Sequence, residues 1–229
     1  ESLVHSIEIE HGWWLKTTVV SNNLLETLHG EGTQIEEISW DVSLDNDGNP
    51  HVKFVYWDAG TEMTTLSLAS YSDGTWGISN IYAHHRSMQS ALVIDSNGGI
   101  HVAFVDGNWN LIYGSQSDGS EWNFVTVDTE VDWNVEMTID SMNSPIITYI
   151  SATTDRRLKI ASWNPDSDTG SGTWQISDIS GDMAHSDYSM VIDSNDAIHV
   201  AYIIENNGAQ ERNLHYTVVG STTDMIVSS

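Results

Sequence analysis

The chain has 229 residues and no cysteine, and 33 acidic residues against seven lysines and arginines give a formal net charge of −26. Such a surface repels phosphate backbones, so the composition argues against nucleic acid as a partner and favours a cation, a neutral polar ligand or a basic protein. The lack of cysteine excludes disulfides and thiolate metal sites, and the absence of any run of 18 apolar residues argues against a membrane span.

The first predicted element is a strand hairpin over residues 3–20, LVHSIEIEHGWWLKTTVV. Its two halves are rich in the β-branched and aromatic residues that favour strands. The segment LLETLHGEGTQIEE follows it, shows no convincing helical period, and is interpreted as a long loop leading into the next strand.

From residue 37 onward the chain repeats a unit of four short strands. The phrase VIDSNGGIHVAFVD at 93–106 returns as VIDSNDAIHVAYII at 191–204, and in every unit an aspartate ends the first apolar run. We call these residues the anchor aspartates; they recur at intervals of 45–53 residues and are Asp45, Asp95, Asp140 and Asp193. Four antiparallel strands at this period are typical of a β-propeller blade.

The sequence therefore predicts an all-β fold, a single β-propeller domain over residues 1–229. Its repeats span approximately 37–82, 87–128, 132–180 and 185–229, and the hairpin at 3–20 forms an N-terminal half-blade. One blade cannot bury both of its faces alone, which explains why the unit recurs. Four or five blades both fit the length, and completion of the ring by another copy of the chain is a further alternative.

Three turns, SYSDGTW at 70–76, SQSDGSEW at 115–122 and SDTGSGTW at 167–174, resemble the Asp-box, or bacterial neuraminidase repeat, of sialidase-like propellers. The resemblance implies a propeller fold and leaves the activity open, because propellers host many functions. On this interpretation Asp73, Asp118 and Asp168 accept hydrogen bonds from turn amides, and the tryptophan after each turn wedges between blades.

A histidine stands six residues after three of the four anchor aspartates: His51, His101 and His199, with Ile146 in the third unit. Equivalent residues of different blades lie in a ring too wide to share one metal ion. We therefore interpret these histidines as packing or turn residues.

The loops that enter the first strand of each unit are predicted to meet on one face, where propellers usually bind ligands. Carboxylates, amides and aromatic side chains gather there, as in carbohydrate sites, and such an acidic ring makes Ca²⁺ a candidate ion. The candidate ligand-binding residues are Glu37, Trp40, Asp41, His85, Arg86, Gln89, Asp132, Trp133, Asn134, Glu136, His185, Asp187 and Tyr188.

These features favour a lectin-like, carbohydrate-binding propeller at an extracellular or cell-surface location. A polysaccharide-active glycoside hydrolase or lyase is one alternative, since the acidic ring could supply a pair of facing carboxylates. A sialidase is disfavoured, because Arg156, Arg157 and Arg212 fall in turns expected to lie away from the channel mouth. A structural module that self-associates through its incomplete terminal blade is the other alternative.

Overall fold

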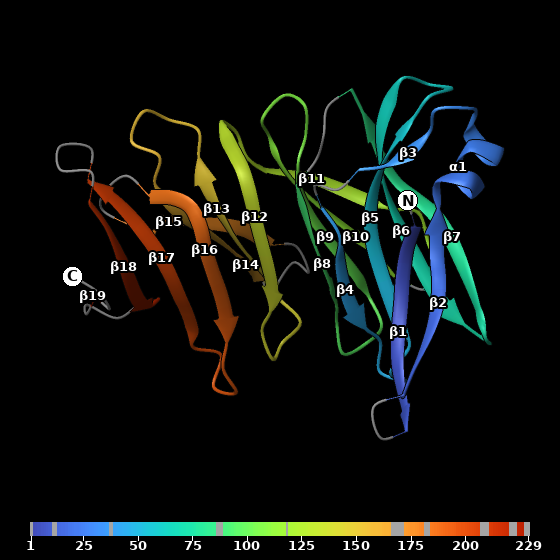
Figure 1. The fold of residues 1–229 in the computed structure, drawn as a ribbon. Helices are drawn as coiled ribbons and strands as arrows, with labels where there is room; N and C mark the ends of the chain where they lie inside the picture. Colours follow the sequence, from blue (N-terminus) through green and yellow to red (C-terminus); the bar gives the residue numbers. More distant parts are fainter. Residues whose placement is uncertain are drawn as a thin grey trace. The chain divides into compact units, whose positions relative to one another are not determined.

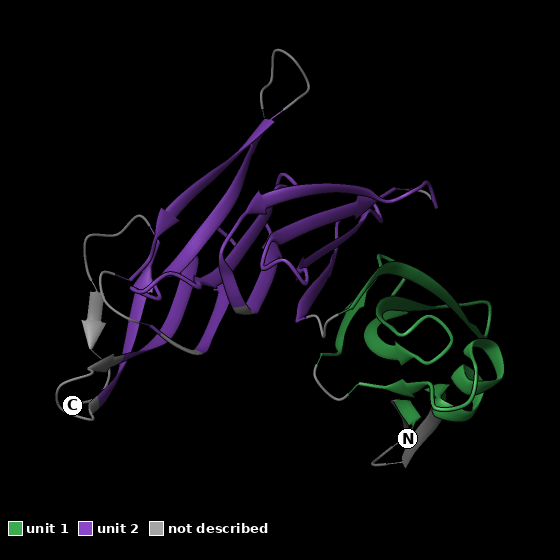
Figure 2. Ribbon diagram, turned by 90° about the horizontal axis from the view of Figure 1, so that it is seen from above, with its two compact units in different colours: residues 1–88 green, residues 89–229 purple. Residues whose placement is uncertain are grey.

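The structure is a computed structural model, and among the residues that it describes strands dominate (Figure 1). It describes residues 2–10, 13–36, 39–85, 89–117, 119–165, 172–180, 184–206, 211–219 and 224–226. The chain forms two compact units, residues 1–88 and 89–229 (Figure 2), which are described separately. The single domain expected from the sequence stays a prediction.

The described residues of unit 1 form a hairpin, one helix and a five-stranded sheet in which β3 and β4 both pair with β5. The elements are β1 (Ser2–Glu10), β2 (Trp13–Ser21), α1 (Asn22–His29), β3 (Gln34–Ile35), β4 (Asp41–Leu44), β5 (Pro50–Asp58), β6 (Met63–Ser72) and β7 (Thr75–His84). We call β4–β7 blade 1. The hairpin predicted at 3–20 is confirmed.

In unit 2, the part of the chain that the structure describes forms three four-stranded antiparallel sheets, each built from consecutive strands. Blade 2 comprises β8 (Ser90–Ile94), β9 (Ile100–Val105), β10 (Leu111–Gln116) and β11 (Asn123–Asp128). Blade 3 comprises β12 (Val131–Ile139), β13 (Pro145–Ser151), β14 (Leu158–Pro165) and β15 (Gly172–Asp178). Blade 4 comprises β16 (Ala184–Ile192), β17 (Ile198–Asn206), β18 (Glu211–Val218) and β19 (Asp224–Ile226). The predicted all-β fold of four-stranded blades is confirmed.

Apolar side chains from neighbouring blades of unit 2 form shared cores. One cluster joins Val105 and Leu111 of blade 2 to Val135 and Tyr149 of blade 3. A second joins blade 3 to blade 4, where Tyr202 is 2% exposed. Each blade thus covers its neighbour's apolar face, which is what the recurrence of the unit requires.

The prediction of a loop after the hairpin was wrong, because residues 22–29 form helix α1. The side chain of Ser21 accepts a hydrogen bond from Leu24 N and caps the start, and Gly30, with φ of 106°, ends the helix. Only Leu25 is buried, while Leu24 and Leu28 are exposed, so eight residues carry too little apolar period for the sequence to reveal a helix.

The anchor aspartates organise the turn between the first two strands of every blade. In each case Oδ1 accepts hydrogen bonds from the backbone amides two and four residues further on, at 2.7–3.0 Å. The third residue after the anchor has a positive φ, and it is Gly48, Gly98, Asn143 or Asp196. Glycine, asparagine and aspartate tolerate this conformation best, so the repeated Asp/Asn/Gly pattern encodes the turn.

The repeated histidines tie this turn to the third strand of the blade. His101 Nε2 lies 3.1 Å from Asp95 Oδ2, and its Nδ1 lies 2.5 Å from the Tyr113 hydroxyl. The same arrangement joins Asp193, His199 and Tyr216 in blade 4. The prediction that these histidines are turn and packing residues is confirmed for these blades.

The contact between Asp95 and His101 predicts that the stability of the fold depends on pH in the acidic range. Burial alone would raise the pKa of Asp95, but hydrogen bonds from His101, Gly99 and Asn97 outweigh burial and lower it. The stability that Asp95 contributes is therefore present above the unfolded pKa of about 4 and is lost as the pH falls through the lower folded value. Asp95→Asn should cost about 1–2 kcal/mol at pH 7 and weaken the acid dependence of thermal unfolding. If the melting temperatures of the original protein and Asp95→Asn fell equally steeply with decreasing pH, this prediction would be contradicted.

The Asp-box turn of blade 1 differs from the expectation. Asp73 and Gly74 have φ of 50° and 82°, which is a two-residue type I′ hairpin turn. Asp73 is exposed, and its side chain accepts no hydrogen bond in the described part of the chain. An aspartate therefore suits this position because it tolerates the turn's backbone conformation, and not because it binds turn amides. Asp118 and Asp168 lie outside the described residues. The wedge role of the tryptophans is confirmed at Trp174, which packs against the core shared by blades 2 and 3.

Candidate functional site

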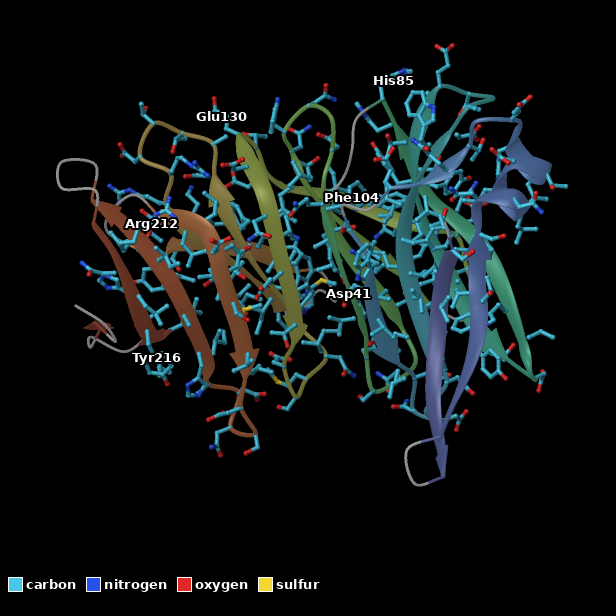
Figure 3. All side chains as sticks on the ribbon, in the orientation of Figure 1. Asp41, His85, Phe104, Glu130, Arg212 and Tyr216 are labelled. Carbon is cyan, nitrogen blue, oxygen red and sulfur yellow. The ribbon has the colours of Figure 1, made fainter. Side chains whose placement is uncertain are left out.

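The structure separates the candidate residues into several groups. Glu37 and Arg86 lie outside the described residues, as do the side chains of Trp133 and His185. In unit 1, Trp40 is 60% exposed, Asp41 begins β4, and His85 is exposed, with Nδ1 3.4 Å from the Glu62 carbonyl (Figure 3).

Three candidates of unit 2 lie between blades 3 and 4. The buried Tyr188 donates its hydroxyl to the carbonyls of Asn134 and Thr148, and Glu136 accepts a hydrogen bond from the backbone amide of Met190. Burial raises the pKa of Tyr188, so the phenol stays protonated and serves as a donor. These contacts join two blades. Gln89, half-buried, precedes β8, and Asp187 lies exposed on β16.

Asp132 lines a pocket of about 620 Å³ that we call the turn pocket. It is formed by the β9–β10 turn, the β11–β12 connection and the β13–β14 turn, and its lining includes Asn108, Trp109, Glu130, Asp132, Thr153 and Arg156. Figure 3 shows Glu130 at this end of unit 2, whereas Tyr216 lies at the opposite ends of the strands.

The turn pocket contains an ion pair, with Arg156 Nη2 2.5 Å from Asp132 Oδ2. Backbone hydrogen bonds hold the segments together, since Val131 N donates to the carbonyl of Trp109 and Ala152 N donates to that of Glu130. Arg156 therefore reaches the face predicted for ligand binding, against the expectation that its turn lies away from it. Sequence reasoning missed the arginine because it treated the β13–β14 turn separately from the loop before β12.

A second pocket, about 250 Å³ in volume, lies between blades 2 and 3, and we call it the aromatic pocket. Its lining residues are Tyr113, Ser115, Asn123, Val125, Asn143, Pro145, Trp163 and Trp174. Trp174 packs edge-on against both Tyr113 and Trp163, with ring centroids 5.2 and 5.5 Å apart. Two tryptophans and a tyrosine thus line one pocket together with polar side chains.

Strand pairing explains how the two tryptophans meet. Trp163 of β14 and Trp174 of β15 are direct cross-strand partners. Gly172 makes room for the Trp163 ring, because a Cβ at residue 172 would collide with the indole. From the sequence, Trp174 was predicted only to wedge between blades. The hairpin register of SWNPDSDTGSGTW is the signal that would have paired Trp174 with Trp163.

Polar groups of the aromatic pocket are suited to bind hydroxyls. Burial raises the pKa of Tyr113 to about 12, so its phenol is neutral at physiological pH. Asn143 Oδ1 already accepts two hydrogen bonds from Ser96, which leaves its amide NH₂ as a donor. The indole Nε1 of Trp174 is buried with no hydrogen-bond partner in the described part of the chain, an arrangement that native proteins seldom leave unsatisfied.

Neither pocket offers an evident metal centre. Among the described residues, no group of three or more His, Cys, Asp or Glu side chains is placed to hold a metal ion. The residues proposed for Ca²⁺ include Glu37, which lies outside that range, so calcium binding stays a prediction. No helix in the described part of the chain has the length and apolar character needed to cross a membrane.

No protein-family model and no curated protein sequence matches the chain. Solved structures match it in fold. AofleA from Arthrobotrys oligospora superposes with a TM-score of 0.58 at 12% identity, over 96% of this chain and 63% of that one. The SapL1 lectin in complex with alpha methyl fucoside gives 0.57 at 14% identity, over 95% and 69%. The intramolecular trans-sialidase from Ruminococcus gnavus, in complex with oseltamivir carboxylate, gives 0.54 at 14% identity, over 90% and 47%.

These similarities define the class of the protein as all-β with a β-propeller fold. The trans-sialidase match confirms the fold-level part of the Asp-box resemblance, although no family model supports the motif itself. This chain spans only part of each of the three matched chains, so their ligands and activities belong to them.

Proposed function

We propose that this protein is a lectin-like propeller that binds a neutral sugar in the aromatic pocket between blades 2 and 3. The observation that carries the proposal is the convergence of Tyr113, Trp163 and Trp174 beside amide and hydroxyl groups in one pocket. Sugar rings present an apolar C–H face and a rim of hydroxyls, and aromatic rings with planar amides match both.

The size of the pocket supports a small ligand. At about 250 Å³ it falls just below the range of roughly 300–1,000 Å³ that is typical of pockets for drug-sized molecules. One sugar ring suits such a volume better than an extended chain. The SapL1 lectin, bound to alpha methyl fucoside, makes methyl fucoside a reasonable first probe among neutral monosaccharides.

The composition supports a neutral ligand, and an extracellular or cell-surface setting is part of the proposal. A net charge of −26 disfavours anionic polysaccharides at long range, whereas a neutral glycan meets no such barrier. Catalysis is less favoured, because no carboxylate is among the described residues that line the aromatic pocket. A hydrolase or lyase would need an acid and a base beside the bound sugar.

Titration of a panel of neutral monosaccharides, including methyl α-fucoside, tests the proposal. Trp163→Ala should weaken binding at least about fivefold, because aromatic contacts of this kind contribute about 1–3 kcal/mol. Trp122→Ala is the matched control: Trp122 stacks on Phe124 of blade 2 and lines neither pocket, so affinity should not change.

Gly172→Ala provides a second variant that keeps every side chain of the pocket. The added methyl group would collide with the Trp163 indole and with the Asn164 carbonyl, so binding should fall although both tryptophans remain. Equal affinity in the original protein, Trp163→Ala and Gly172→Ala would contradict the proposed site. Failure of the unaltered protein to bind any sugar on a broad glycan array would contradict the proposed function.

A further inference from the structure

The turn pocket contains backbone conformations that its residues do not favour. Trp109 and Arg156 have φ of 64° and 41°, and Glu130 has φ of 57°. All three line the pocket. A positive φ is uncommon for residues other than glycine and is least expected for bulky side chains, and such strain gathers at functional sites.

The turn around Trp109 has the same design as the anchor turns, which allows a direct comparison. Asp106 Oδ1 accepts hydrogen bonds from the amides of Asn108 and Asn110, and Trp109 N donates to the Asp106 carbonyl. In the four anchor turns the equivalent left-handed position is Gly48, Gly98, Asn143 or Asp196. The chain therefore places a tryptophan where the other turns of this design have glycine, asparagine or aspartate, so the indole side chain sets the Trp109 turn apart.

The charges of the turn pocket favour a cation. Asp132 is paired with Arg156, whose guanidinium side chain is 41% exposed, whereas exposed Glu130 makes no ion pair among the described residues. The pocket thus carries two carboxylates against one guanidinium, in a chain of net charge −26. Trp109 and Glu130 are neighbours, because Val131 N, one residue after Glu130, donates to the Trp109 carbonyl.

We propose that the turn pocket is a second binding site, distinct from the aromatic pocket, for an amino sugar with a free ammonium group. The ammonium group pairs with the Glu130 carboxylate and packs against the Trp109 ring, because the face of an indole attracts cations. The sugar hydroxyls accept hydrogen bonds from Arg156 and Asn108, which also line the pocket. The pocket volume of about 620 Å³ accommodates more than one ring, so an oligosaccharide of deacetylated amino sugars is the expected ligand.

Calorimetric titration with glucosamine oligosaccharides and with N-acetylglucosamine oligosaccharides of the same length tests the proposal. We expect binding of the free-amine form, weakened by salt, and at least tenfold weaker binding of the acetylated form. Glu130→Gln should lower the affinity for the free amine about fivefold to tenfold. Equal binding of the two forms, or binding of neither, would overturn the proposal.

Trp109→Gly separates a ligand-binding role from a structural one. Glycine suits the left-handed turn, so the melting temperature should stay unchanged or rise by about 1–3 °C while amino-sugar binding is lost. A lower melting temperature with unchanged affinity would show that the indole serves the fold, and would overturn the assignment. Nα-acetyl-lysine amide keeps a free ε-ammonium group but has no sugar ring, and if it bound as tightly as the amino sugar, the assignment to an amino sugar would be overturned.

This proposal and the neutral-sugar proposal fail separately. Trp163→Ala should leave amino-sugar binding unchanged, since Trp163 does not line the turn pocket, and Trp109→Gly should leave neutral-sugar binding unchanged. Loss of both activities in either variant would contradict two independent sites.

Discussion

Tyr149→Ala is expected to destabilise unit 2 by about 3–5 kcal/mol, the usual cost of removing a large buried aromatic side chain. Tyr149 is fully buried in the cluster that joins blades 2 and 3, and its hydroxyl donates to Asp128 Oδ2 at 2.6 Å. The substitution removes the ring from the shared core. It also removes the hydroxyl donor from the Asp128 carboxylate, whose Oδ2 keeps its ion pair with Lys159 Nζ at 3.7 Å.

Urea unfolding, followed by far-ultraviolet circular dichroism, measures this effect. Tyr149→Phe is the control, because it keeps the ring and removes only the hydrogen bond, at a cost of about 1–2 kcal/mol. If the alanine variant lost no more stability than the phenylalanine variant, the core between blades 2 and 3 would not hold the unit together as described.

Lys53→Met is expected to remove a rise in stability at alkaline pH. Burial lowers the pKa of Lys53 to about 8, against an opposing effect of Asp41, and its Nζ donates to Ser39 Oγ at 2.7 Å. From about pH 8 to 10 the unfolded chain still holds a proton that the folded chain has released, so folding becomes more favourable as the pH rises. The pKa difference corresponds to about 3 kcal/mol.

Unfolding free energies at pH 7, 9 and 10 test this prediction. The original protein should gain stability over this range, and Lys53→Met should show a flat profile and higher stability at pH 7. Above about pH 10 the profile turns downward, because burial raises the pKa of Tyr56 and Tyr113 in the folded state. An alkaline gain that persisted in Lys53→Met would assign it to another group.

The repeat made the fold predictable from sequence. Each anchor turn needs an aspartate whose Oδ1 accepts hydrogen bonds from two backbone amides, and then a residue that tolerates positive φ. These residues recur at a fixed spacing, which can be found in the sequence. Helix α1 was missed for the opposite reason. It is short, buries only Leu25, and is held by tertiary contacts such as that of His29 Nδ1 with Asp58 Oδ2 at 3.2 Å.

The pockets were less predictable than the fold, because they combine turns and strands from different blades. Asp132 was identified from its place before a first strand, but its partner Arg156 comes from a turn 24 residues later. The aromatic pocket depends on the register that pairs Trp163 with Trp174 and on the contact of blade 3 with Tyr113 of blade 2. The residue pattern along one strand reveals neither the ion pair nor the contact between blades.

The most direct measurement of the central claim is a heteronuclear NMR titration of the tryptophan indole N–H signals with the tightest-binding neutral sugar. The proposed site predicts progressive, saturable shifts of the Trp163 and Trp174 signals, with the Trp122 signal unchanged. Shifts confined to tryptophans outside the aromatic pocket, or saturation that leaves Trp163 and Trp174 unmoved, would contradict a sugar site between blades 2 and 3.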